Sequence, residues 1–489
     1  MIRGCANCVI VLLAAVAALV GATDRGYCEA PHPVAVPPDP ITSQLLQVVV
    51  LSRHGDRSPL RPIPNEYLDK RVVWNCSFRA PLRAFTADAR LQSTTFVFFL
   101  FSLSLYFTTH FTHVSLKKTT KTTFFTITIT TTTNRGLYYL YDEHGTGVFG
   151  DNSSWNGNCE AGQLTARGGE MCAQMGAGLR EIYVDKFGLL PAALGAGDAD
   201  LLYLRTTDFV RTRESLASLM EGLYPADRRA GVYLPVHVVA TDADYMHPNV
   251  VACPRLAQLV EKNTVANPEW MAHFARVRPV LARVNALAGT ANMSGFDSAY
   301  TVDAWADILH ARECHDLPYP CARDGRACVT QDMVDALADA AAWEAAHLYA
   351  GDEAQRLAAG PFFMDLARIF AARVSHGTHS TQGARMPHAS TRASTARYHH
   401  YSAHDSTIDT VVSALKVDGG FPPYASTVRF ELWQTAPAPA PAYAVQIVYN
   451  NRVLQPPECS APMCPLSDFL AMVNTRLTIR NKDLECARR

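Results

Sequence analysis

The sequence predicts an α/β fold: a doubly wound, mainly parallel sheet with an inserted, mostly helical second domain. Short β-branched runs alternate with helix-like segments, which is the pattern of βαβ units. A long Ala-rich, helix-like stretch interrupts this alternation at 254–396. The chain has 489 residues, of which 48% are hydrophobic, so a sizeable core is available. Its net charge of −1 gives no basic excess that would indicate a nucleic-acid partner.

The N-terminus has the features of a secretory signal peptide at 1–22. Arg3 precedes an apolar run from Val9 to Val20, and Ala22 supplies a small residue at the cleavage position. The run is too short to span a bilayer, which disfavours an uncleaved anchor. We therefore expect a protein of the secretory pathway that is secreted, held in the lysosomal or endosomal lumen, or displayed at the cell surface.

Thirteen cysteines agree with an oxidising compartment. Cleavage after Ala22 would remove Cys5 and Cys8, and the odd number that remains leaves one thiol free or intermolecular. Three sequons make the chain a candidate glycoprotein. The candidate glycosylation sites are Asn75, Asn152 and Asn292.

The first part of the α/β domain is predicted at 44–253, after a Pro-rich leader at 23–43. Leu45–Leu51 is an unbroken, β-branched run that suits a strand buried on both faces. Further strand-like runs and helical segments follow in alternation. The strands are expected at 199–204 and 236–240, and the helices at 163–187, with Thr165 as N-cap, and at 209–223.

The second part of the α/β domain is predicted at 397–489, after a helical cap domain at 254–396. Within the cap, helical patterns stand out at 330–347 and 361–372. Near the end of the chain, two strand-like runs resemble a β-pair. These runs are 427–433 and 444–449.

A low-complexity insertion at 93–133 fits none of these elements. An apolar run, short for a membrane span, precedes a Thr-rich tract of high β propensity and low charge. Three interpretations stay open: a disordered insertion or retained non-coding sequence, a genuine surface loop, and a membrane-associated hairpin. A disulfide between Cys76 and Cys159 would close the base of this segment.

The strongest chemical signal follows the first strand. Arg53 and Arg57 bracket His54 at the carboxyl end of a buried strand, where open α/β sheets gather functional groups. Guanidinium groups match phosphate oxygens, and an imidazole between two of them can attack phosphorus while they neutralise the anion. A solvated polar loop is the alternative. Asp56 is expected to orient an arginine.

Two later segments place polar groups after strands in the same way. Arg205 would lie beside the arginines around His54 if their strands are neighbours, whereas Arg211 and Arg213 are interpreted as solvated or salt-bridged groups of the next helix. At His404 and Asp405, the histidine can donate to phosphate and the carboxyl can protonate a leaving oxygen.

No metal or organic cofactor is expected. The remaining histidines lack metal-binding spacings such as H-E-x-x-H, and the chain has no phosphate-loop motif. These histidines are His376, His379, His388, His399 and His400.

Taken in order, these segments resemble the histidine acid phosphatase family, in the branch of prostatic and lysosomal acid phosphatases. The matching motifs are RHGDRSP at 53–59, GQLTARG at 162–168, LRTTDFVRT at 204–212 and YSAHDST at 401–407. The resemblance covers about residues 44–60 and 160–489, while 61–160 is longer than the family usually has between its first two motifs.

The resemblance implies a two-step hydrolysis of phosphate monoesters, with an acidic optimum and without a cofactor. His54 would form a phosphohistidine, and Asp405 would protonate the leaving alcohol. The phosphoryl group would be bound by Arg53, Arg57, Arg205 and His404. Small phosphate monoesters and phosphoproteins are the implied substrates, and a homodimer is the implied assembly.

The resemblance also implies disulfides between Cys459 and Cys464 and between Cys253 and Cys486. The family's partner for Cys314 is replaced here by Thr427, which leaves Cys321 or Cys328 as alternatives. Two other functions stay open: a more selective phosphomonoesterase acting on phytate or lysophosphatidate, and a catalytically silent surface glycoprotein that only binds phosphate.

Overall fold

The computed structural model describes most of the chain outside the N-terminus and the 77–154 region. The described ranges are 27–38, 43–64, 66–76, 155–229, 231–241, 243–291, 301–376, 396–436 and 441–487, with the backbone of 94–97, 114–118 and 125–129. The predicted signal peptide, Asn152 and Asn292 lie outside these ranges. Asn75 lies within them and is exposed.

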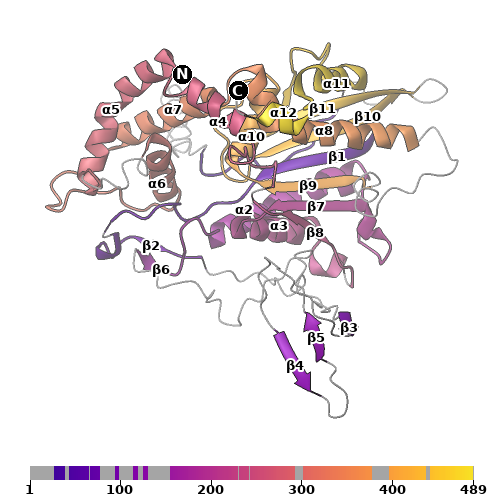
Figure 1. The fold of residues 1–489 in the computed structure, drawn as a ribbon, viewed down its shortest axis with the longest axis horizontal. Coiled ribbons are helices and arrows are strands. Elements are labelled where there is room, and N and C mark those ends of the chain that lie inside the picture. Colours follow the sequence, from indigo (N-terminus) through magenta and orange to yellow (C-terminus); the bar gives the residue numbers. More distant parts are fainter. Residues whose placement is uncertain are drawn as a thin grey trace, which may run out of the picture.

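A mixed sheet of eight strands forms the centre of the molecule (Figure 1). Its order is β12-β11-β10-β1-β9-β7-β8, and β13 pairs with β11. The neighbours β1, β9, β7 and β8 are parallel, and the other pairs are antiparallel. The strands are β1 (Gln44–Arg53), β7 (Leu202–Thr207), β8 (Val236–Val239), β9 (Tyr398–Ala403), β10 (Thr427–Ala436), β11 (Ala442–Tyr449), β12 (Arg452–Leu454) and β13 (Met463–Pro465). The predicted α/β class is confirmed, with parallel pairing confined to the half of the sheet that contains the three motif strands.

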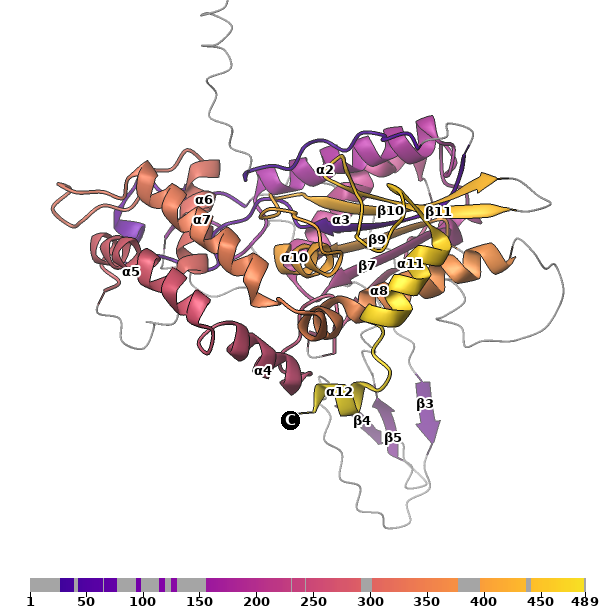
Figure 2. The ribbon, with the colours of Figure 1, turned by 90° about the horizontal axis from the view of Figure 1, so that it is seen from above.

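Helices cover both faces of this sheet (Figure 2). On one face, α2 (Ala166–Arg180) and α3 (Val210–Leu223) share a core with Val48 and Val50 of β1. On the other, α8 (Asp352–His376), α10 (Asp405–Ala414) and α11 (Leu466–Met472) share a core with Val49 and Leu51. Since alternate β1 residues enter opposite cores, the unbroken apolar run belongs to a strand buried on both faces, as the sequence predicted.

The helices of the 254–396 segment divide between two cores. α5 (Pro268–Ala288), α6 (Val302–Cys314) and α7 (Gln331–Leu348) build a core of their own around Trp305. α4 (Pro254–Asn263) packs in a separate small cluster with the start of α8. The rest of α8 packs on the sheet, so the helical layer beside the strand ends consists of α5, α6 and α7.

Short elements complete the described chain. They are β2 (Val73–Trp74), β6 (Asn156–Gly157), α12 (Lys482–Cys486), the 3-10 turns η1 (Glu66–Leu68), η4 (Asp198–Leu201) and η5 (Ala226–Arg228), and the π-helical turns η3 (Glu181–Lys186) and η6 (Val473–Leu477). In the low-complexity insertion, β3 (Thr94–Val97), β5 (Phe125–Ile129) and β4 (Val114–Lys118) pair only with one another. Among the described residues, no helix has the length and apolar character needed to cross a bilayer.

Five disulfides join the described cysteines. Two are the implied pairs, Cys253–Cys486 and Cys459–Cys464, and a third, Cys76–Cys159, closes the base of the insertion. The alternatives for Cys314 were wrong, because Cys321 and Cys328 bond to each other. Cys314 instead bonds to Cys28, and the remaining described thiol is Cys172, which is buried and free.

The leader explains the changed partner of Cys314. Residues 27–38 do not simply extend away from the fold, since Ala30 donates to the carbonyl of Tyr424 and Cys28 lies in the core between the sheet and α2. The leader thus supplies the half-cystine that bonds to Cys314, which Thr427 cannot do. The disulfide ties the leader to the C-terminal end of α6.

Candidate active site

Two motif strands end side by side. Arg53, the last residue of β1, pairs in register with Ala403, the last residue of β9, and the His54 backbone donates to the Ala403 carbonyl at 3.0 Å. The rings of His54 and His404 therefore lie edge to face, with centroids 5.6 Å apart. The predicted meeting of the two histidine segments at one sheet edge is observed.

Glycines hold the loop after β1 tightly against α2. A Cβ atom at Gly55 would lie 2.1 Å from the Gly168 carbonyl oxygen, and one at Gly168 would lie 2.0 Å from the Asp56 carbonyl oxygen. Neither distance is compatible with a side chain, so glycine is required on both sides of this contact. This contact gives a physical reason why the segments at 53–59 and 162–168 belong to one site.

Asp56 does not orient an arginine, which corrects the expectation from its position. Its carboxylate accepts a hydrogen bond from the hydroxyl of Thr165 and pairs with Nε2 of His315 at 2.6 Å. Thr165 is the N-cap of α2, as predicted, and accepts from the Gly168 backbone. Asp56 thereby joins the loop after β1 to the start of α2 and to the end of α6.

His54 is buried and held in one tautomer. Its Nδ1 lies 2.8 Å from the Gly55 carbonyl oxygen, which can only accept, so Nδ1 has the proton and Nε2 keeps its lone pair. Burial and the positive charges of Arg211 and Arg53 lower the pKa of His54 well below its ordinary value. The imidazole is therefore neutral and able to act as a nucleophile through Nε2.

The two arginines around His54 are each fixed by a carboxylate. Arg53 is fully buried, pairs with Asp405 at 2.8 Å and lies over the ring of Tyr424 at 4.2 Å. Arg57 pairs with Asp307 of α6 at 2.8 Å. These pairs position the guanidinium groups before any substrate arrives.

Arg205 does not join this group, contrary to the prediction. β9 lies between β1 and β7, so the strands of Arg53 and Arg205 are not neighbours. Arg205 pairs with buried Asp244 at 2.7 Å and lies over the ring of Tyr245 at 4.2 Å, outside the cavity lining. It is a structural ion pair beside the site.

Arg211 occupies the place predicted for Arg205. It lines the cavity, its Nη2 lies 3.3 Å from Nδ1 of His404, and its guanidinium covers the ring of Phe209 at 4.7 Å. No carboxylate pairs with it among the described residues, and burial, with the charge of Arg57, lowers its pKa to about 9. Such a cation is suited to bind an anion that is absent from the free protein.

A sequence signal for Arg211 existed. It is the second residue of α3, and long helical side chains lean toward the helix N-terminus, which here follows the end of β7. Its neighbour Arg213 behaves as expected and pairs with Asp208. Their spacing along the helix did not by itself distinguish the arginine that lines the cavity from the one that pairs with Asp208.

His404 is oriented by a chain of hydroxyl groups. Since Arg211 can only donate to Nδ1, His404 donates from Nε2 to the hydroxyl of Thr207 at 3.0 Å, and Thr207 donates in turn to Thr212 at 2.9 Å. His247 stacks on the His404 ring with centroids 4.9 Å apart. Burial and the charge of Arg211 hold the pKa of His404 well below its ordinary value.

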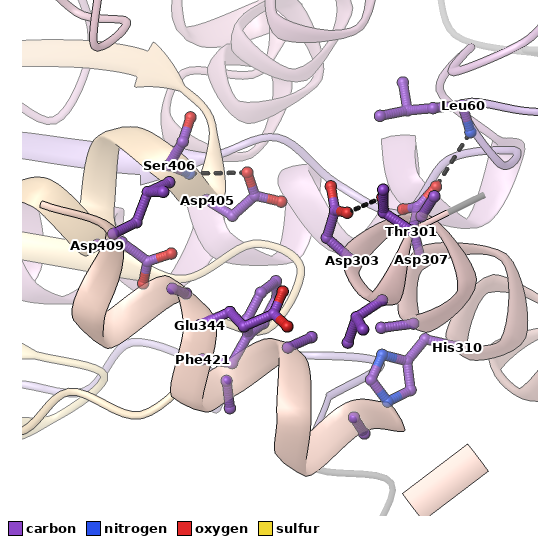
Figure 3. A pocket seen from close by; sticks show the side chains of 18 of the residues that line it. Leu60, Thr301, Asp303, Asp307, His310, Glu344, Asp405, Ser406, Asp409 and Phe421 are labelled. Carbon is purple, nitrogen blue, oxygen red and sulfur yellow. Dashed lines mark hydrogen bonds between the residues drawn. The ribbon is translucent and has the colours of Figure 1, made fainter. Parts of the chain in front are cut away.

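A cavity of about 810 Å³ lies between the sheet edge and the cap helices, and Figure 3 shows part of its lining, including Asp405. Its lining includes His54, Arg57, Arg211, His247 and His404, whereas Arg53 lies behind it, paired with Asp405. Arg57, Arg211, His54 and His404 gather at the sheet end. At the cap end, α5, α6 and α7 contribute aromatic, alanine and acidic side chains. The main ones are Trp270, Phe274, Asp303, Ala341, Ala342 and Glu344.

The other histidines with a possible metal role are dispersed. His399 and His400 are buried in β9 and contact Gln47 and Ser52, while His379 and His388 lie outside the described residues. Within the described part of the chain, no three His, Cys, Asp or Glu side chains are grouped as metal ligands.

The family follows from a comparison with known proteins. A model of the histidine phosphatase superfamily (branch 2) matches residues 44–450. This chain belongs to that superfamily. The phosphatase is 27% identical to counting factor 60 of Dictyostelium discoideum over 448 residues, covering 91% of this chain and 88% of the relative. It is 24% identical to human lysophosphatidic acid phosphatase type 6 over 439 residues, covering 89% and 84%.

A solved structure agrees on the fold. The phytase of Hafnia alvei in complex with tartrate has a TM-score of 0.52 and 16% identity, covering 92% of this chain and all of the phytase chain. At this identity the likeness concerns the α/β architecture alone. Family membership and the arginine-lined histidine site together make the chain a phosphomonoesterase.

Proposed function

We propose that this phosphatase is an acid phosphatase that hydrolyses phosphate monoesters through a phosphohistidine on His54. The observation behind this proposal is the buried, neutral imidazole, whose Nδ1 is fixed by the Gly55 carbonyl and whose Nε2 is free to attack. It lies in a cavity that also contains cations able to neutralise a phosphoryl group.

The phosphoryl group is held by Arg53, Arg57 and Arg211 in this proposal, with Arg211 in the role first given to Arg205. In the free enzyme Nδ1 of His404 accepts from Arg211, so His404 joins them only when the bound anion lets that nitrogen take up a proton and donate it. Nε2 of His54 forms a bond to phosphorus as the ester P–O bond breaks. The leaving oxygen takes a proton from Asp405. Water then attacks the phosphohistidine, the P–N bond breaks, and the proton of the water returns to Asp405.

The electrostatics of Asp405 favour work at acidic pH. Burial by itself would raise the pKa of Asp405, but the charges of Arg53 and Arg57 outweigh burial and lower the pKa below its ordinary value. Asp405 is therefore ionised in the free enzyme. A bound phosphate anion offsets the arginine charges and restores the affinity of Asp405 for a proton, which acidic solution supplies more readily.

The cap end of the cavity favours a leaving group with little negative charge. Its aromatic and alanine side chains suit an apolar moiety, and the carboxylate of Asp303 would repel further phosphates. Burial and the charge of Asp303 raise the pKa of Glu344 to about 7, so that this side chain is neutral at acidic pH. These contacts disfavour phytate and favour a monoester of a partly apolar alcohol. Lysophosphatidic acid phosphatase type 6 is the named relative whose substrate has this character.

The silent-glycoprotein alternative has less support, because every residue of the proposed mechanism is present and assembled around one cavity. A secretory location, glycosylation and a lumenal or surface destination complete the proposal, and the disulfides fit an oxidising compartment. A homodimer and phosphoprotein substrates stay predictions from the resemblance.

Hydrolysis of p-nitrophenyl phosphate against pH tests this function. The protein is produced as a secreted form beginning at Thr23, with and without 93–133, and compared with His54→Ala. We expect an acidic optimum and the loss of nearly all activity in His54→Ala. Full activity of His54→Ala would exclude the mechanism, and a folded, vanadate-binding but inactive wild type would favour the silent alternative.

A further inference from the structure

A second carboxyl group lies close to Asp405 in the same cavity. Asp405 and Asp409 both belong to α10, and a separation of four residues places them one turn apart on one helix face. Both line the cavity, and Figure 3 shows their carboxyl groups on its wall, on either side of Ser406. The mechanism above leaves Asp409 without a role.

Asp405 is held as an ionised group in the free enzyme. Its Oδ2 accepts from the guanidinium of Arg53 at 2.8 Å, and its Oδ1 accepts from the backbone amide of Ser406 at 2.7 Å. Both oxygens thus act as acceptors, and one of the donors is a cation, which stabilises the carboxylate over the acid. Before substrate binds, Asp405 therefore does not itself hold the proton that the leaving oxygen needs.

Asp409 has the opposite surroundings. Among the described residues no donor reaches its carboxyl group, and the groups that face it are Asp405 of α10, Arg53 of β1, Tyr349 at the end of α7 and Tyr449 of β11. Glu344 lines the same cavity. α8 packs on this helix through apolar side chains, and its Gln355, which does not titrate, donates to Ser413. Burial and the negative charge of Asp405 raise the pKa of Asp409 well above its ordinary value.

We propose that Asp409 holds the proton in the free enzyme and passes it through Asp405 to the oxygen of the leaving alcohol. This inference rests on the proposed function. Phosphate binding offsets the charge of Arg53, so the proton moves from Asp409 to Asp405 and then to the leaving oxygen as the P–O bond breaks. In the second step, the proton released by the attacking water returns through Asp405 to Asp409, so protons balance over the cycle.

The test compares leaving groups that need a proton with one that does not. Asp409→Asn keeps the size and polarity of the side chain but has no acidic proton. Its kcat/KM is measured with p-nitrophenyl phosphate and with glycerol 2-phosphate. The p-nitrophenolate leaves without a proton, whereas the glycerol alkoxide needs a proton to leave. We expect kcat/KM to fall about 100-fold or more for glycerol 2-phosphate and less than about threefold for p-nitrophenyl phosphate.

Two variants control for structural effects. Asp339→Asn removes an exposed carboxyl group on the α7 rim of the cavity, away from α10, and should leave both substrates unaffected. Asp409→Glu keeps an acidic proton at the position and should recover a large part of the glycerol 2-phosphate activity. Equal losses on both substrates in Asp409→Asn, or no loss on either, would overturn the proposal. An inactive wild type would instead reject the phosphatase mechanism itself.

Discussion

Because Arg211, and not Arg205, lines the cavity, we predict opposite effects when each of the two arginines is replaced by glutamine. The ordinary pKa of arginine is 12.5, and burial among like charges lowers that of Arg211 to about 9. At about 1.4 kcal/mol for each tenfold change in proton affinity, the environment disfavours this cation by roughly 3–5 kcal/mol. Arg211→Gln should therefore stabilise the free protein, by about 1–3 kcal/mol after the lost packing on Phe209 is counted.

The same substitution should severely damage catalysis. Charge-assisted hydrogen bonds are each worth about 1.5–3 kcal/mol, and loss of two such bonds to the phosphoryl group lowers kcat/KM about 10²–10⁴-fold. Arg205→Gln should do the reverse, because Asp244 is left buried without its cation at a cost of about 3–5 kcal/mol. Its kcat/KM at a temperature where the variant is folded should stay within about threefold of wild type.

Thermal unfolding without phosphate and kcat/KM on p-nitrophenyl phosphate measure both effects. Vanadate protection adds a direct reading of anion binding, which should be lost in Arg211→Gln and retained in Arg205→Gln. A stable, fully active Arg211→Gln together with an inactive but equally stable Arg205→Gln would refute the placement of Arg211 at the phosphate site.

Three further predictions follow from the site and its supports. Because the pKa of His54 lies well below its ordinary value of 6.5, the nucleophile stays neutral as the pH falls. We expect the acid limb of the kcat/KM profile to lie well below pH 6.5, and a limb near 6.5 would contradict this account. The pair Cys28→Ser and Cys314→Ser should destabilise the protein by about 2–5 kcal/mol in chemical denaturation and weaken substrate binding. Substrate binding should weaken because Tyr27, next to Cys28, lines the cavity and contacts Arg53. Unchanged KM values would show that the leader does not shape the site. Thr165→Ala removes the α2 cap and a donor to Asp56, and should cost about 1–2 kcal/mol in the same assay; no loss would mean that the cap is replaced by water.

The parts of the site that were predictable are those encoded by contiguous segments. A strand buried on both faces is visible in Leu45–Leu51, and polar residues directly after it must lie at the sheet edge. The same reasoning located His404 and Asp405, and the N-cap pattern at Thr165 located the start of α2. In each case one local pattern determines both the element and the position of the side chain in it.

The parts that were missed depend on strand order and on distant segments. β9 enters the sheet between β1 and β7, and nothing near Arg205 in the sequence shows that insertion. The partner of Cys314 depends on the path of the leader, which brings Cys28 into the core. Asp409 looks like an ordinary polar residue on a helix, and only the packing of α10 against the cavity shows that it faces the proposed reaction.

Trapping the phosphoenzyme tests the central claim most directly. The wild-type enzyme is mixed with a phosphate monoester, quenched within milliseconds to seconds, digested and analysed by mass spectrometry under alkaline conditions, which preserve phosphohistidine. We predict a phosphoryl group on the peptide that contains His54, absent from His54→Ala and formed at a rate that accounts for turnover. Turnover by wild-type enzyme without a phosphorylated His54, or with the phosphoryl group on another residue, would contradict the account.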